Sequence, residues 1–201
     1  MKTRWLSLLL VGLVVGTGSC GDDKKVTRVS ESEVTDISDK WNDTDSRLVA
    51  QEMISSCLGD GWVDNATKEL GKKPVVIVQL IKNKASEHIA VGTFAKDLER
   101  MLIKDGRIKF VASASERESI RAERADQADN ASDDTMNSGG KELGANFALK
   151  GSIEVINQRD GGTQVKFYQV NLELISLSDN SKAWIGDKKI KKVINQAGAK
   201  W

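Results

Sequence analysis

The sequence contains one histidine and one proline among its 201 residues, and only 5% of the residues are aromatic. The single histidine, His88, excludes a metal site built from several histidines and gives little basis for a Ser-His-Asp triad. The glycine-rich phosphate loops of nucleotide-binding proteins and the Gly-x-Ser-x-Gly turn of hydrolases are also missing. We therefore expect no enzymatic activity, metal, cofactor or small-molecule substrate. A pair of catalytic carboxylates stays open, because any two acidic residues could meet in the fold.

An excess of charge of one sign is missing as well. The chain has 30 basic and 29 acidic residues, and two of the basic ones, Lys2 and Arg4, lie in an N-terminal segment that is expected to be removed. The remaining chain is close to neutral, so it lacks the basic surface by which proteins bind nucleic acid. We expect no nucleic-acid partner.

The N-terminal segment has the pattern of a lipoprotein signal peptide. A basic start is followed by an apolar run over residues 6–15 that is too short to cross a bilayer. Small residues stand directly before Cys20, which predicts a signal peptide over residues 1–19 and a lipid on the Cys20 sulfur, although Thr17 departs from the Leu-like residue usual at that position. The alternative is an ordinary secretory signal in which Cys20 is incidental.

Residues 20–40 are too polar to bury a face of their own and are expected to form a tether. About twenty residues reach roughly 70 Å when fully extended and about 25 Å as a flexible coil. A globular domain is expected over residues 41–192, followed by a flexible tail over residues 193–201.

The first part of this domain shows helical spacing and then a buried strand. Val49, Met53 and Cys57 recur every four residues behind a cap at Asp43 or Thr44, which predicts an amphipathic helix. Cys57 is interpreted as a core residue, with a reactive thiol as the alternative. The β-branched run 75–81 predicts a central strand.

The middle of the domain is predicted to be mainly helical. A stripe of apolar residues predicts a helix over residues 93–104, and a short strand is expected over residues 107–112. Ser115 and Glu118 are predicted to form a capping box that opens a charged helix ending near residue 128. A surface loop over residues 129–140 and a short helix over residues 141–143 follow.

The last third of the chain changes to a period of two. Alternating apolar residues in 147–155 and 168–174 flank the turn at residues 160–162, and a third strand carries Trp184. Trp184 is interpreted as packing in the core or at the sheet edge, with a partner contact as the alternative. The predicted fold is an α+β domain with a small, mainly antiparallel sheet, a C-terminal three-stranded meander and flanking helices.

One helix face is a candidate for binding a partner. On the helix over residues 93–104, with about 100° per residue, Ile103 points away from the apolar stripe. The charged residues Lys96, Glu99 and Arg100 surround it, so an apolar centre has a polar rim, as in a small protein contact. The alternative is that Ile103 packs under a neighbouring loop.

The order of these features carries a family resemblance. The order begins with a lipobox, a polar tether and a helix with Met53, and it continues with a strand, Asn83 and the helix 93–104. The segments 108–113, 144–151 and 170–186 follow. This set resembles the LpoB-type penicillin-binding-protein activators over about residues 41–192. The resemblance implies a fold similar to the N-terminal domain of TolB. Known members carry a long Pro-rich tether, whereas this tether is short and has no proline.

The resemblance implies an outer-membrane lipoprotein whose domain faces the periplasm. It implies a bifunctional penicillin-binding protein as the partner, whose peptidoglycan synthesis the lipoprotein stimulates without catalysis of its own. Inner-membrane residence stays open. The alternative function is a structural subunit of an outer-membrane or curli-secretion-like assembly, and an envelope enzyme is a third possibility.

Overall fold

A computed structural model describes residues 26–36, 38–137 and 139–195. The predicted signal peptide, Cys20 and the end of the predicted tail lie outside these residues. The chain divides into two units, the first ending at Glu33 and the second starting at Val34. In the described part of the first unit, the Glu33 amide donates to the carbonyl oxygen of Ser30 at 3.0 Å. The helices and strands described below belong to the second unit.

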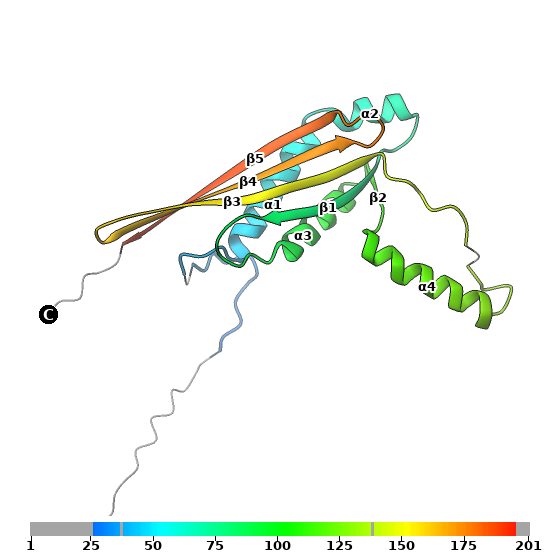
Figure 1. The fold of residues 1–201 in the computed structure, drawn as a ribbon, viewed down its shortest axis with the longest axis horizontal. Coiled ribbons are helices and arrows are strands. Elements are labelled where there is room, and N and C mark those ends of the chain that lie inside the picture. The colour runs from blue at the N-terminus through cyan, green and yellow to red at the C-terminus, as the bar shows by residue number, and fades with distance from the viewer. Residues whose placement is uncertain (1–25, 37, 138, 196–201) are drawn as a thin grey trace, which may run out of the picture. The chain divides into compact units, whose positions relative to one another are not determined.

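Two helices open the second unit, strands and helices then alternate, and three long strands complete it (Figure 1). The helices are α1 (Asp43–Gly59), α2 (Trp62–Leu70), α3 (Val91–Asp105) and α4 (Ala114–Asn130). The strands are β1 (Val75–Asn83), β2 (Lys109–Phe110), β3 (Phe147–Asp160), β4 (Thr163–Ser176) and β5 (Lys182–Asn195).

The strands form one sheet in the order β2-β1-β3-β4-β5. The last three strands are antiparallel neighbours, so the predicted α+β fold with a C-terminal meander is confirmed. The other two pairings are parallel, since β1 lies parallel to both β2 and β3. Parallel strands need a crossover connection, and α3 provides it between β1 and β2.

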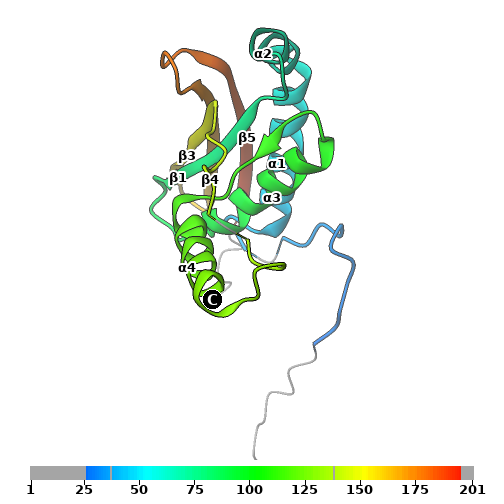
Figure 2. The same cartoon turned by 90° about the vertical axis from the view of Figure 1, so that its right-hand side faces the viewer.

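Helices α1 and α3 cover one face of the sheet (Figure 2). Alternate residues of β4 point to this face, and Tyr168, Val170, Leu172 and Leu174 are almost completely buried there. Cys57 of α1 and Trp184 of β5 are also buried, which confirms both as core residues. Strand β5 runs to Asn195, beyond residue 192 where the sequence pattern placed the end of the domain.

The structure corrects both predicted helix caps. Helix α1 is capped by Asn42, whose side chain accepts from the Asp45 amide at 2.9 Å, and neither Asp43 nor Thr44 is the cap. Helix α4 is capped by Ser113, whose capping-box partner is Glu116. The predicted Ser115 and Glu118 pair has the same spacing two residues later, so spacing alone could not decide between the two starts.

Two other element predictions need correction, and one helix was missed. Residues 141–143 are not helical, and the strand predicted over residues 107–112 is only two residues long in β2. Helix α2 was not predicted. Its nine residues do carry the helical spacing, since Trp62, Val63 and Ala66 lie on one buried face, so this helix was detectable from the sequence.

A buried ionic network holds the start of the second unit against the sheet. The Lys166 ammonium of β4 lies 2.7 Å from Glu87 and 3.0 Å from Asp39. The Tyr168 hydroxyl donates to Glu87 at 2.6 Å, and the Trp41 amide donates to the same carboxylate at 2.9 Å. The segment before α1 is therefore fixed to β4 through one partly buried glutamate.

Strand β5 makes a second connection of this kind. Lys192 pairs with Lys166 across the two strands, and its ammonium lies 2.6 Å from Asp45 and 3.3 Å from Asp36. It also donates to the carbonyl oxygen of Lys40 at 2.9 Å. Two lysines on neighbouring strands thus hold the chain where it enters the domain.

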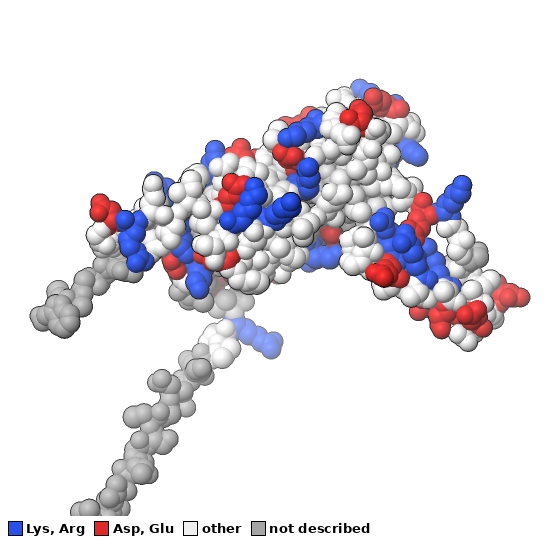
Figure 3. Space-filling view, viewed as in Figure 1, with Lys and Arg blue, Asp and Glu red and all other residues white. Residues whose placement is uncertain are grey.

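Helix α4 lies outside the packed layers. None of its seventeen residues, all of which the structure describes, is buried. In Figure 3, basic side chains gather along one side of this helix and acidic ones toward its far end. Arg121 and Arg124 of this helix pair with Glu142 of the returning chain.

Candidate partner-binding site

Helix α3 has one buried face and one exposed face. Phe94, Leu98 and Leu102, spaced by four residues, are at most 1% exposed and pack into the core. Ile103 is 57% exposed, so it points away from this stripe as the sequence predicted. An isoleucine with this exposure is common on protein surfaces, and its surroundings decide whether it forms part of a site.

Ile103 lines a groove of about 400 Å³ between three elements. Helix α3 forms one wall, the chain around β2 forms the floor, and the start of α4 forms the opposite wall. The apolar lining residues are Ile103, Phe110, Val111, Ala112 and Ile120. Ile120 is 44% exposed, so a second large apolar side chain is accessible across the groove from Ile103. The groove therefore has an apolar interior that solvent reaches.

Charged residues connect α3 to α4 at this groove. The Lys96 ammonium lies 2.7 Å from Glu99 on its own helix and 2.5 Å from Glu116 of α4. The hydrogen bond from Lys96, together with those from Ser113, lowers the pKa of Glu116 to about 2. The same two carboxylates raise the pKa of Lys96. Lys96 and Glu116 are therefore both charged at neutral pH and fix the start of α4 beside α3.

The structure places the four predicted site residues at different distances from the groove. Glu99 and Ile103 line it, and Lys96 bridges its two helices. Arg100 pairs with Asp97 at 2.7 Å and does not line it, although its side chain is 73% exposed. Their binding role stays a prediction.

Sequence reasoning missed the residues that α4 and β2 contribute to the groove, Ile120 and Phe110 among them. Ile120 was detectable as the one large apolar residue of a charged helix. Its position opposite Ile103 depends on how α4 is placed, and no local pattern shows that.

Three further observations concern a metal site, a reactive thiol and a membrane-spanning helix. Among them, no group of three His, Cys, Asp or Glu side chains is arranged to hold a metal ion. Burial raises the pKa of the Cys57 thiol to about 12, so this sulfur is a poor nucleophile at neutral pH. No helix in the described part of the chain is both long and apolar enough to cross a membrane.

Comparisons with known proteins place the chain in a family. No curated protein matches the sequence. Among solved structures, the LpoB C-terminal domain from Escherichia coli has 17% identity and a TM-score of 0.46, with 74% of this chain and 99% of that chain covered. The Salmonella enterica domain has 15% identity and a TM-score of 0.44, with the same shares covered.

A third solved structure, of Escherichia coli LpoB determined by NMR, has 13% identity and a TM-score of 0.42, and the match covers 98% of this chain and 93% of that chain. The family model described as the peptidoglycan-synthase activator LpoB matches residues 45–190. This range includes all of α2, α3 and α4 and most of the sheet. Because the model matches well over half of the sequence, the chain belongs to the LpoB family of peptidoglycan-synthase activators.

Proposed function

We propose that this protein is a lipid-anchored envelope protein that binds a bifunctional penicillin-binding protein and stimulates its synthesis of peptidoglycan. Membership of the LpoB family supports the activator role. The domain acts as a regulator, and the synthase performs the chemistry. The observation that carries the choice of binding face is the pair of exposed isoleucines, Ile103 and Ile120, on opposite walls of one groove.

The groove has the composition of a small protein contact. An apolar interior with charged residues at its edge is the usual arrangement, because the buried centre supplies most of the binding energy and the rim excludes water. Lys96, Glu99 and Glu116 form this edge, and their mutual ion pairs order it before any partner arrives. A large apolar side chain of the synthase is the natural occupant of the interior.

The Ile103→Asp variant is expected to lose stimulation of the synthase while keeping its fold. When the synthase covers the groove, the introduced carboxylate would be buried without a counter-charge. This costs about 2 kcal/mol or more of binding free energy, or roughly 30-fold in affinity. Thermal stability should change little, because Ile103 is already 57% exposed. Binding by calorimetry and glycan polymerisation with the purified synthase measure the two effects.

Leu80→Asp is the matched control, since Leu80 is 73% exposed on β1 and does not line the groove. Arg100→Glu should weaken binding less than Ile103→Asp, mainly through a slower association rate. Full stimulation by folded Ile103→Asp and Arg100→Glu proteins would rule out this face. A large drop in the melting temperature of Ile103→Asp would instead assign Ile103 to the folded core.

Cys20→Ala is expected to abolish incorporation of radiolabelled palmitate and to release the protein from the membrane fraction. The physical basis is that lipid attaches to the sulfur of this cysteine. Cys57→Ala is the control and should keep the label, because the Cys57 thiol is buried in the core. Density fractionation of the labelled protein tests the proposed outer-membrane residence. Unchanged labelling of Cys20→Ala would show that the protein is not anchored at this residue.

A further inference from the structure

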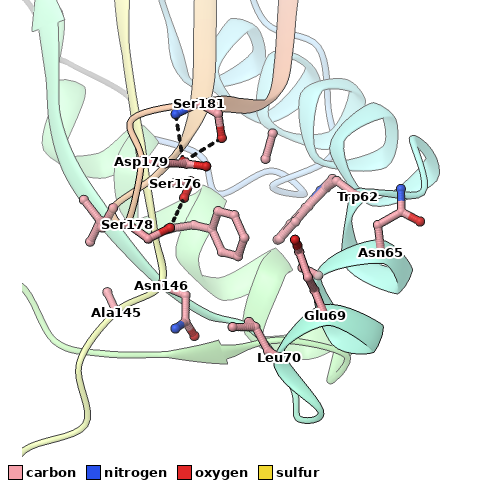
Figure 4. Close-up of a pocket in the computed structure, with 14 residues that line it drawn as sticks. Trp62, Asn65, Glu69, Leu70, Ala145, Asn146, Ser176, Ser178, Asp179 and Ser181 are labelled. Carbon is pink, nitrogen blue, oxygen red and sulfur yellow. Dashed lines mark hydrogen bonds between the residues drawn. The ribbon is translucent and has the colours of Figure 1, made fainter.

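A larger cleft, of about 690 Å³, lies between α2 and the turn that joins β4 to β5 (Figure 4). One face of α2 forms its first wall, because the lining residues of this helix are spaced by three or four positions. The opposite wall is the turn over residues 177–181, and the start of β3 forms the base. No residue of this cleft belongs to the groove at Ile103.

The apolar part of the cleft is rigid. The Trp62 indole nitrogen donates to the carbonyl oxygen of Cys57 at 2.8 Å, and the indole packs edge to face on Phe147 with ring centroids 5.3 Å apart. Leu70 extends the same wall by two helical turns. Trp62 is 5% exposed and Leu70 is partly exposed, so Leu70 and the accessible edge of the indole provide the apolar surface against which an aliphatic chain can pack.

The charged side chains that line the cleft are both acidic. They are Glu69 of α2 and Asp179 of the turn, and no Lys or Arg is among the lining residues. In Figure 4 the two side chains extend from opposite walls. Within the described residues, the Glu69 carboxylate has no hydrogen bond or ion pair. This cleft therefore has negative charge that the described part of the protein leaves uncompensated.

Asp179 is held in its charged form by its own turn. Hydrogen bonds from the Ser181 amide, the Ser176 side chain and the Ser181 hydroxyl lower the pKa of Asp179 below its usual value. The nearest lysine along the strand, Lys182, is engaged by Glu173 at 2.8 Å. A positively charged ligand group would thus meet the Asp179 carboxylate on one wall and Glu69 on the other.

Asn146 supplies a donor at the base. Its side-chain oxygen accepts from the Val75 amide at 3.0 Å, which orients the side-chain amide. Its main-chain carbonyl accepts from the Leu177 amide at 2.8 Å, so the residue is fixed from both sides. Within the described residues the N–H groups of its side chain have no acceptor, so they are available for a carbonyl oxygen of a ligand.

We propose that this cleft binds a lysine or arginine side chain carried by a short extended segment of a protein partner. The cationic group lies between Glu69 and Asp179, its aliphatic stem packs on Trp62 and Leu70, and a peptide carbonyl accepts from Asn146. The volume is within the range of ligand pockets, about 300–1,000 Å³, and accommodates a few residues. The inference rests on the proposed function only in assuming a protein partner, and it names a second contact for that partner.

The test uses the full-length protein, labelled with ¹⁵N and followed by NMR. The probes are acetyl-Ala-Arg-Ala-amide, its Lys counterpart, and a citrulline peptide that keeps the shape of arginine without the charge. We expect saturable shifts of Glu69, Asn146 and Ser178 with the two basic peptides. The citrulline peptide should bind at least tenfold more weakly, because it loses a charge-assisted hydrogen bond. Equal binding of the citrulline peptide would overturn the proposal.

Two substitutions locate the binding. Glu69→Gln should weaken the binding of the basic peptides at least fivefold. Glu118→Gln, which removes an exposed carboxylate from α4, should leave their affinity unchanged. Ile103→Asp should also bind the peptides normally, so a failure of the proposed synthase contact is distinguishable from a failure of this site. Shifts confined to residues outside the cleft, or no saturable shifts with either basic peptide, would contradict the assignment.

Discussion

Glu87→Ala is expected to lower the free energy of unfolding by about 3–5 kcal/mol, because it leaves a buried lysine without its main partner. The side chains of Lys166 and Glu87 are only 8% and 13% exposed, so water replaces little of the lost interaction. The variant also removes the acceptor of the Tyr168 hydroxyl and of the Trp41 amide. Urea unfolding followed by circular dichroism measures the change.

A double-mutant cycle separates the pair from its surroundings. Lys166→Met and Glu87→Gln are each expected to destabilise the fold. The double variant should lose less free energy of unfolding than the sum of the two single losses. Lys191→Met is the surface control, since Lys191 is exposed on β5 without an ion pair in the described chain, and its effect should stay within about 0.5 kcal/mol. Additive effects of the two network variants would show that the pair is not coupled.

The network also predicts how stability depends on pH. Burial acts to raise the pKa of Glu87, but hydrogen bonds from Lys166 and Tyr168 outweigh it and hold this pKa below its ordinary value. The stabilisation from Glu87 is therefore present above the unfolded pKa of about 4.3 and is lost as the pH falls through the folded pKa. The stability difference between the wild type and Glu87→Gln should shrink in that acid range. A constant difference down to low pH would contradict the assigned role of this carboxylate.

Gly151→Ala is expected to destabilise the protein by about 3 kcal/mol, because the sheet leaves no room for a Cβ atom. A Cβ at this position would lie 2.2 Å from the main-chain oxygen of Asn171 and 2.6 Å from the Leu172 side chain. Since one of these atoms belongs to the backbone of the paired strand, relief requires β3 and β4 to move apart. Thermal unfolding measures the loss.

Gly144→Ala provides the matched control for this substitution. It lies a few residues earlier, and a Cβ there would meet no atom within 4 Å. We expect an unchanged melting temperature. If Gly151→Ala were as stable as Gly144→Ala, the close approach of the two strands at Gly151 would be incorrect.

Local patterns identified the parts of the fold that follow from one stretch of chain. The four-residue stripe of Phe94, Leu98 and Leu102 was sufficient to define α3 and to place Ile103 on its outer side. The two-residue alternation ending at Leu174 was sufficient for the meander. In each case the pattern and the structure depend on the same neighbours along the chain, so the sequence determined the element and its buried face.

Tertiary structure decided everything that joins distant segments. The parallel pairing of β1 with β3, the ion pair between Glu87 and Lys166, and the groove between Ile103 and Ile120 each depend on how separate elements pack. Periodicity carries information about which face of an element is apolar, but not about which other element covers it. The sequence therefore determined most of the long elements, their order and the family resemblance, whereas only packing in three dimensions assembled the groove and the cleft.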